Sequence, residues 1–498
     1  MYYKRLKKGM IKMKKKSLFK RVCLITTALT LVIGNASCKK EVADGENLKL
    51  VWYCTSSGKD PDHDKVLAVF NQKLKEKYGM ELEFYPITGG EYASKMQVLN
   101  ASREEYDLCY VNGLTNYYNN IKNGVYYDIT DLLPKYAPKT YKSLSDEVWK
   151  AASCDNRIYA VPNWQIMARS DCLVVPKNWL EKTNTSMDDL NTMEDLGKYL
   201  EKVVAINPAA NKVKSNSFKF RYYGFVDIYH ASAPGMIRIS DFESKDAPIV
   251  VNQYESDEFK EFVNFSYDMV KKGCFYDTYS PDTSGASARG EEPYSFSSTY
   301  KPGIAEELQA NYGFELEAKQ FSTATITPTN VMATATAVSA TSRNPEKAVE
   351  FIEIMNTDKE LYNLLCWGIE GEHYKKISDN VIEPVDMNKY GYYNWAIGSV
   401  KNSFTLSNQD KDVWEKTAEL NESALASPLM GMVIDTTTIT TEIADCETVI
   451  NQKLPLLAQG LVEPEKGIPE LVDALKVAGS DKIIAELQRQ VDEWWATK

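Results

Sequence analysis

The chain has 498 residues, of which 44% are apolar and 26% charged, a composition typical of a folded globular protein that excludes a largely disordered one. A chain of this length predicts two or three domains rather than a single core. The formal net charge is −11, which excludes broad nucleic-acid binding because contacts with phosphates need a basic surface.

The first 37 residues have the pattern of an export signal. They contain ten lysines and arginines and no acidic residue, and an apolar run of 12 residues follows, from Val22 to Ile33. This run is too short for a membrane-spanning helix, which needs about 20 residues. We therefore predict that residues 1–37 are a signal peptide and that the exported remainder carries a net charge of −21.

The end of this signal resembles a bacterial lipoprotein box, in which cleavage leaves an N-terminal cysteine that carries a lipid. The residues concerned are Ala36, Ser37 and Cys38. The resemblance implies a lipid anchor on Cys38, and the polar residues 38–47 then form a flexible tether to the cell membrane. Cleavage nearby without lipidation, which would give a secreted protein, is the alternative.

The folded part opens with alternating strand and helix patterns. Residues 48–53 are continuously apolar, as in a buried parallel strand, and residues 80–87 alternate between apolar and polar. A third strand is predicted over residues 106–111. Two helices are predicted between these strands, over residues 63–78 and around Tyr92, Met96 and Leu99.

This β-α-β-α-β order predicts a parallel, doubly wound sheet. Ligands bind such sheets beyond the carboxyl ends of the strands, which here are residues 54–58 and 111–115. Further along, Pro345 follows Asn344 and opens the clearest helix, because proline fits a first helical position and asparagine can cap it.

Few residues of this chain are suited to catalysis or metal binding. Nine cysteines are widely spaced without a CxxC pair, and only three histidines are present, so we interpret the cysteines as small buried residues. Nucleophile-elbow, P-loop, HExxH and EF-hand motifs are absent. The acidic residues 60–64 are interpreted as a first helical turn that complements the helix dipole, with a metal site as the alternative.

Aromatic side chains are the more promising candidates, since tyrosine alone accounts for 31 residues. An aromatic ring can lie flat against the C–H face of a sugar. The candidates in predicted loops are Trp164, Tyr222, Tyr223, Tyr229, Trp367 and residues 390–398.

Three features together resemble the extracellular solute-binding proteins of bacterial ABC importers, in particular the sugar-binding, LipO-like lipoprotein group. They are the export signal with its cysteine, the β-α-β-α-β opening and the sequence NPEKAVEFIEIMNTDKELYNLLCWGIEGEHY at residues 344–374. The resemblance implies an α/β, type II periplasmic-binding-protein fold, in which two α/β lobes joined by hinge strands close around a ligand cleft. It places lobe 1 at residues 48–163 and 330–372, and lobe 2 at residues 164–329 and 373–498.

The resemblance also implies that the protein captures a solute without changing it chemically, and the group favours an oligosaccharide. No cofactor and no metal are implied. The partners are the solute, the permease subunits of an ABC transporter and, through the lipid, the extracellular face of the cell membrane; the protein is expected to be a monomer. The implied ligand-binding residues are Ser56, Ser57, Tyr110, Asn112, Trp164, Tyr229, Trp367, Glu370, His373, Asn394 and Trp395.

Three other functions remain open at this point. A peptide-binding receptor could share the same fold, a lipoprotein enzyme could act on glycans at the cell surface, and an adhesin or sensor could have lost the permease. Turnover of a glycan would favour the enzyme, whereas stoichiometric binding without product would favour the receptor.

Overall fold

A computed structural model describes residues 48–111, 113–206, 218–229, 232–279, 290, 292–297 and 299–498. The predicted signal peptide, the anchor Cys38, the tether and the candidate Asn112 lie outside the described residues. No helix in the described ranges combines the length and the apolar character that crossing a membrane requires.

The first sheet has five strands in the order β2-β1-β3-β13-β6. β1, β2 and β3 are parallel, as predicted, whereas β13 runs antiparallel to its neighbours β3 and β6. The strands are β1 (Leu48–Ser56), β2 (Met80–Thr88), β3 (Leu108–Val111), β6 (Ala160–Pro162) and β13 (Ala335–Val338).

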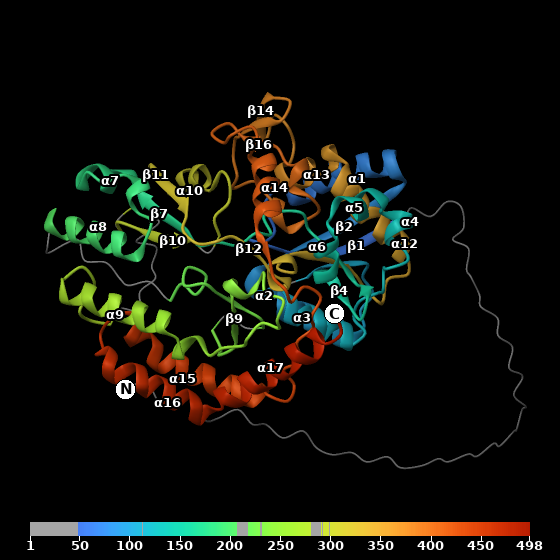
Figure 1. Ribbon diagram of the computed structural model, residues 1–498. Coiled ribbons are helices and arrows are strands. Elements are labelled where there is room, and N and C mark those ends of the chain that lie inside the picture. The colour runs from blue at the N-terminus through green and yellow to red at the C-terminus, as the bar shows by residue number, and fades with distance from the viewer. Residues whose placement is uncertain are drawn as a thin grey trace, which may run out of the picture. The chain divides into compact units, whose positions relative to one another are not determined.

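The first two helices lie where the sequence predicts them, α1 at His63–Tyr78 and α2 at Gly89–Ser102 (Figure 1). The predicted stripe of Tyr92, Met96 and Leu99 is buried. α1 ends at Gly79, whose φ of 68° is a left-handed conformation that glycine adopts without strain.

The remaining helices of this first half pack around the same core, whereas β14, β15 and β16 form a small sheet with an apolar cluster of its own. α12 begins at Pro345 as predicted, but the side chain of Asn344 makes no capping hydrogen bond. The elements are α3 (Leu114–Lys122), α4 (Leu133–Tyr136), α5 (Pro138–Ser143), α6 (Asp146–Ala152), α12 (Pro345–Thr357), α13 (Lys359–Trp367), β4 (Ser153–Cys154), β5 (Arg157–Ile158), β14 (Tyr374–Ser378), β15 (Val381–Pro384) and β16 (Thr405–Leu406).

A second sheet has the order β10-β7-β11, with both outer strands antiparallel to β7. Helices α9, α15 and α16 pack against one another (Figure 1). The elements are β7 (Cys172–Pro176), β8 (Phe225–Asp227), β9 (Met236–Arg238), β10 (Ser295–Ser297), β11 (Leu316–Gln320), α7 (Lys177–Thr183), α8 (Met193–Ile206), α9 (Asp257–Lys271), α10 (Ile304–Tyr312), α15 (Thr440–Ala458), α16 (Pro464–Ala478) and α17 (Ser480–Trp495).

Two chain segments run side by side between the two sheets. Residue Arg169 pairs with Thr325 through two backbone hydrogen bonds of 2.8 and 3.0 Å. The side chain of Asn421 accepts hydrogen bonds from the N–H groups of residues 167 and 168 and donates to the carbonyl of residue 165. The elements here are β12 (Thr325–Ile326), β17 (Leu425–Ala426), α11 (Pro328–Val331) and α14 (Val413–Ser423).

Buried apolar side chains form two large clusters, one around each sheet. The predicted lobe boundaries stay a prediction. Because the buried residues Tyr390, Ala396, Ile397 and Val400 belong to the first cluster, we propose that the last passage into the second lobe lies near residue 430 rather than at 373.

The seven described cysteines are free and buried, which confirms their interpretation as small core residues. Burial raises the pKa of the Cys54 and Cys109 thiols to about 12. These groups are therefore protonated and unreactive in the folded protein.

Candidate functional site

The carboxyl ends of β1, β2, β3 and β6 meet at one edge of the first sheet, where the antiparallel β13 begins. Ser56 at the end of β1 lies opposite Thr88 at the end of β2, and Ala335 at the start of β13 pairs with both Val111 and Pro162. Open α/β sheets bind ligands in the crevice at such an edge. The sequence-predicted candidates Ser56, Tyr110 and Trp164 all lie on or beside it.

The serines after β1 differ in accessibility. Ser56 is buried, and its hydroxyl accepts a hydrogen bond from the N–H of Gly58 at 2.9 Å, which fixes the turn. Ser57 is exposed and follows directly. Tyr110 is buried and its hydroxyl donates to the carbonyl of Ala333 at 3.2 Å. Of these three, Ser57 offers its hydroxyl most openly to a solute.

Asn163 ties the strand end to a distant loop, although sequence reasoning missed it. Its amide donates to the carbonyl of Ala396 at 2.8 Å, and its Oδ1 accepts from the hydroxyl of Thr336 at 3.2 Å. The position directly after a predicted strand was the available signal. Asn163 is 3% exposed, so we assign it to holding the edge together rather than to solute contact.

Trp164 continues this connection. Its backbone N–H donates to the carbonyl of Gly398 at 3.0 Å, and its backbone carbonyl accepts from the N–H of Val400 at 2.9 Å. The residue is 8% exposed, and the Lys401 ammonium lies 4.1 Å from the centroid of its ring. The indole is therefore held in one orientation with one neighbour already placed on it.

Trp367 and Asn394 meet at one hydroxyl, that of Ser403. The Trp367 indole donates to it at 3.1 Å, and the Asn394 amide donates to it at 3.4 Å. The neighbouring Trp395 is half-buried and its ring stacks on Tyr393 with 4.9 Å between centroids. Because the carbonyl of Ala396 accepts a hydrogen bond from Asn163, the adjacent Trp395 lies beside the strand-end edge. Trp367 is also half-buried, but its indole N–H is already hydrogen-bonded within the protein.

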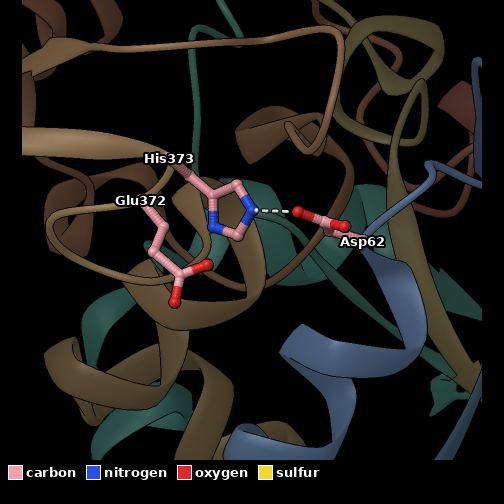
Figure 2. A group of neighbouring side chains, drawn as sticks. All are labelled: Asp62, Glu372 and His373. Atoms are coloured by element: carbon pink, nitrogen blue, oxygen red, sulfur yellow. Dashed lines mark hydrogen bonds and ion pairs between the residues drawn. The ribbon is translucent and has the colours of Figure 1, made fainter.

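His373 lies inside a hydrogen-bond network with Asp62, and Glu372 is the third member of this group (Figure 2). The ring Nδ1 accepts from the N–H of Ile369 at 2.9 Å, so the proton lies on Nε2, which donates to Asp62 at 3.1 Å. Glu372 pairs with Lys65. Both imidazole nitrogens have protein partners, so these hydrogen bonds account for the arrangement without a metal ion.

The last two candidates lie apart from this network. Glu370 is exposed and pairs with Lys376 at 3.8 Å. Tyr229 belongs to the second cluster of apolar side chains, where its hydroxyl donates to the carbonyl of Pro234 at 2.8 Å and burial raises its pKa. The structure thus brings Ser56, Ser57, Tyr110, Trp164 and Trp395 to one edge and does not gather the other described candidates there.

A pocket with a volume of about 570 Å³ lies between α2, β3 and α3 and adjoins this edge at Tyr110. Tyr110 forms part of its wall, and carboxamide side chains line much of the rest. These are Gln97, Asn100, Asn116, Asn120 and Asn123. Carboxamides both donate and accept hydrogen bonds, which suits a ligand with many hydroxyls.

Sequence reasoning also missed three cations near the edge, Arg169, Lys219 and Arg221. Arg169 lies in the stretch of residues 166–175, which is apolar apart from residues 169–171, and a charge inside such a run was the only signal. Asp171, which lies in the same stretch, is 4% exposed and accepts a hydrogen bond from the N–H of Tyr222 at 3.1 Å. This bond holds the two segments that carry the cations next to each other.

Known proteins resemble this chain over nearly its whole length. Residues 69–366 match the family described as bacterial extracellular solute-binding protein, and residues 428–496 match a domain of unknown function. A carbohydrate ABC transporter substrate-binding protein of Streptococcus pneumoniae is 27% identical over 498 residues, which cover 95% of this chain and 97% of that protein.

Solved structures of the N-glycan transport solute binding protein NgtS from Streptococcus pneumoniae have a similar fold. One matches with a TM-score of 0.80 and 24% identity, over 90% of this chain and 99% of that chain. The complex of NgtS with Man5GlcNAc matches with a TM-score of 0.67 and 26% identity, over 91% and 99%. The predicted α/β periplasmic-binding-protein fold is confirmed, and the chain belongs to the bacterial extracellular solute-binding proteins.

Proposed function

We propose that this protein captures an oligosaccharide and delivers it unchanged to the permease of an ABC importer. The observation that carries the proposal is the edge where β1, β2, β3 and β6 of the first sheet end, because the exposed Ser57 and the half-buried Trp395 lie there beside a carboxamide-lined pocket. Aromatic rings and carboxamides are the groups that recognise the C–H faces and hydroxyls of sugars. The carbohydrate-binding relatives support the same solute class.

The connection between the two sheets supports a binding protein that changes shape around its solute. Residues 163–164 lie where the chain leaves the first sheet, on a short segment that links the two apolar clusters. Hinge closure needs a few such residues at the ends of elements. A solute held between both lobes would be desolvated from two sides, which favours tight binding without catalysis.

Isothermal titration calorimetry with Man1GlcNAc, Man5GlcNAc, cello-oligosaccharides and a peptide pool tests this proposal. We expect one oligosaccharide series to bind at one site per chain, with no product detectable by mass spectrometry after incubation. The substitution Trp395→Ala should weaken binding at least tenfold, whereas Trp495→Ala, on the last turn of α17, should not. Binding of peptides alone, or cleavage of a glycan, would contradict the proposal.

We further propose that Cys38 carries a lipid that holds the protein at the extracellular face of the membrane. The position of Cys38 after a 12-residue apolar run and two small residues supports this. Radiolabelled palmitate should be incorporated into the wild-type protein and not into the Cys38→Ala variant. Release of the wild-type protein into the medium without label would favour plain secretion.

A further inference from the structure

Three cations that lie together near the strand-end edge form what we call the basic cluster: Arg169, Lys219 and Arg221. Arg169 lies three residues before β7, and its backbone pairs with Thr325 between the two sheets. Lys219 and Arg221 precede β8, and the bond from the N–H of Tyr222 to Asp171 holds their segment against residues 169–171.

The basic cluster is short of negative charge. Its one acidic neighbour is Asp171, whose carboxylate faces both Lys219 and Arg221. Burial, opposed by these two cations, raises the pKa of Asp171, and burial lowers the pKa of Lys219 and of Arg169. Lys219 and Arg221 therefore share a single, buried carboxylate, and the charge that acts on Arg169 is that of Arg221, which is repulsive.

The other contacts of these cations are neutral. The Arg169 guanidinium donates to the hydroxyl of Thr299. The Lys219 ammonium lies 5.3 Å from the ring centroid of Phe296, and the Arg221 guanidinium carbon lies 4.8 Å from that of Phe220.

The cations of the basic cluster also lack partners. The Nε of Arg221 is buried and has no hydrogen-bond partner. Within the part of the chain that the structure describes, none of the three cations forms an ion pair with a carboxylate.

This arrangement is unusual for a protein with more acidic than basic residues. Cations elsewhere in the described residues pair readily at the surface, as Lys77 does with Asp358 at 2.9 Å and Arg489 with Glu486 at 2.7 Å. A partly buried cation without a paired anion loses hydration that nothing replaces, so it costs stability. Such a cost is typical of a site that is completed by its ligand.

The basic cluster borders the proposed solute site. The Tyr110 hydroxyl donates to the carbonyl of Ala333. Gln165, four residues before Arg169, donates to the hydroxyl of the adjacent Thr334. The charge of Arg169 accordingly opposes the rise of the Tyr110 pKa that burial causes. Tyr110 is at the end of β3 and in the wall of the carboxamide-lined pocket. A solute at the strand-end edge could therefore present one of its groups to the guanidinium of Arg169.

We propose that the solute carries an anionic group, a carboxylate or a sulfate on an oligosaccharide, and that Arg169, Lys219 and Arg221 bind it. This inference rests on the proposed function. A guanidinium can bind either anion through two parallel N–H···O hydrogen bonds, and the ammonium of Lys219 adds a point charge. Asp171 then serves to position the cations rather than to neutralise them.

Matched glycans test the inference on the exported full-length protein. Affinities are measured for a sialylated biantennary N-glycan, for the same glycan after desialylation, and for the desialylated glycan bearing a terminal sulfate. We expect at least one acidic form to bind about tenfold more tightly than the neutral form, since a hydrogen bond to a charged group is worth about that much. Tighter binding of the sialylated or the sulfated form identifies the group as a carboxylate or a sulfate.

Variants connect this preference to the basic cluster. Lys219→Met and Arg221→Gln should each weaken binding of the acidic glycan at least fivefold more than binding of the neutral one. The control Lys245→Gln removes an exposed lysine and should change neither affinity. Thermal unfolding of each variant shows that it is folded before its affinity is interpreted.

The outcomes separate this inference from the proposed function. If the neutral glycan binds as tightly as both acidic forms, or if the variants weaken all three equally, the inference is wrong and the proposed function stands. If no glycan in this set and no neutral oligosaccharide binds, the proposed function is wrong and the inference falls with it.

Discussion

Gly398 is the residue at which a single methyl group should most disturb the connection between the strand-end edge and the loop that covers it. Its φ is 49°, and a Cβ built there would lie 2.3 Å from the carbonyl oxygen of Met355. Its own carbonyl accepts the N–H of Trp164. The substitution Gly398→Ala should therefore strain the backbone, create a clash with the backbone of Met355 and weaken the hydrogen bond between residues 164 and 398.

The expected loss of stability follows from these contributions. A left-handed conformation costs an alanine about 1 kcal/mol, and relief of the clash by moving the loop weakens hydrogen bonds worth about 1 kcal/mol each. A total of about 3 kcal/mol results if two such bonds are lost. With an unfolding entropy of about 2.1 cal/mol/K per residue over about 450 residues, this lowers the melting temperature by about 3 °C.

Differential scanning calorimetry measures this change, and Gly79→Ala is the matched control. Gly79 has a φ of 68°, but its Cβ would meet nothing within 4 Å, so only the backbone strain remains and the shift should be about 1 °C. Hydrogen exchange of residues 160–166 should accelerate in Gly398→Ala alone. Equal melting temperatures for the two variants would refute the role assigned to the contact with Met355.

Three further predictions concern charges and thiols. Burial lowers the pKa of His63, so the unfolded chain binds a proton at this residue before the folded protein does as the pH falls below about 6.5. The free energy of unfolding should therefore decrease from that pH down to the pKa of the folded protein. In urea unfolding, His63→Gln should make stability less dependent on pH between 6.5 and 5, and an unchanged slope would contradict this. Ellman's reagent should not react with Cys54 or Cys109 until the protein is unfolded, and rapid modification of the native protein would show that they are accessible. Lys219→Met should stabilise the solute-free protein by about 1 kcal/mol in urea unfolding, because it removes an uncompensated cation; destabilisation would mean that the ammonium is already neutralised.

The local elements of the first half could be predicted because their signals are local. The stripe of Tyr92, Met96 and Leu99 repeats at helical spacing, and α2 buries these three residues. The place of β13 could not be predicted in this way. It inserts antiparallel between β3 and β6, which are distant in sequence, and short apolar strands carry no signal for their partners.

The same difference between local signals and long-range packing applies to the residues of the candidate site. Ser56 and Tyr110 could be placed at the edge because the carboxyl ends of parallel strands meet there by geometry. The resemblance implied Trp367 and His373 as ligand-binding residues, but the hydrogen bonds to Ser403 and Asp62 that occupy them depend on long-range packing. The basic cluster was missed because its charge balance exists only after segments 50 residues apart have come together.

The basic cluster also has to be reconciled with a chain whose exported part carries a net charge of −21. Exposed charges are screened beyond about 8 Å at physiological ionic strength, so the distant carboxylates repel an acidic solute only weakly. Partly buried cations are screened much less, and their attraction therefore dominates once the solute reaches the strand-end edge. A protein can in this way be acidic overall, remain soluble at the cell surface, and still select an anionic group at one short-range site.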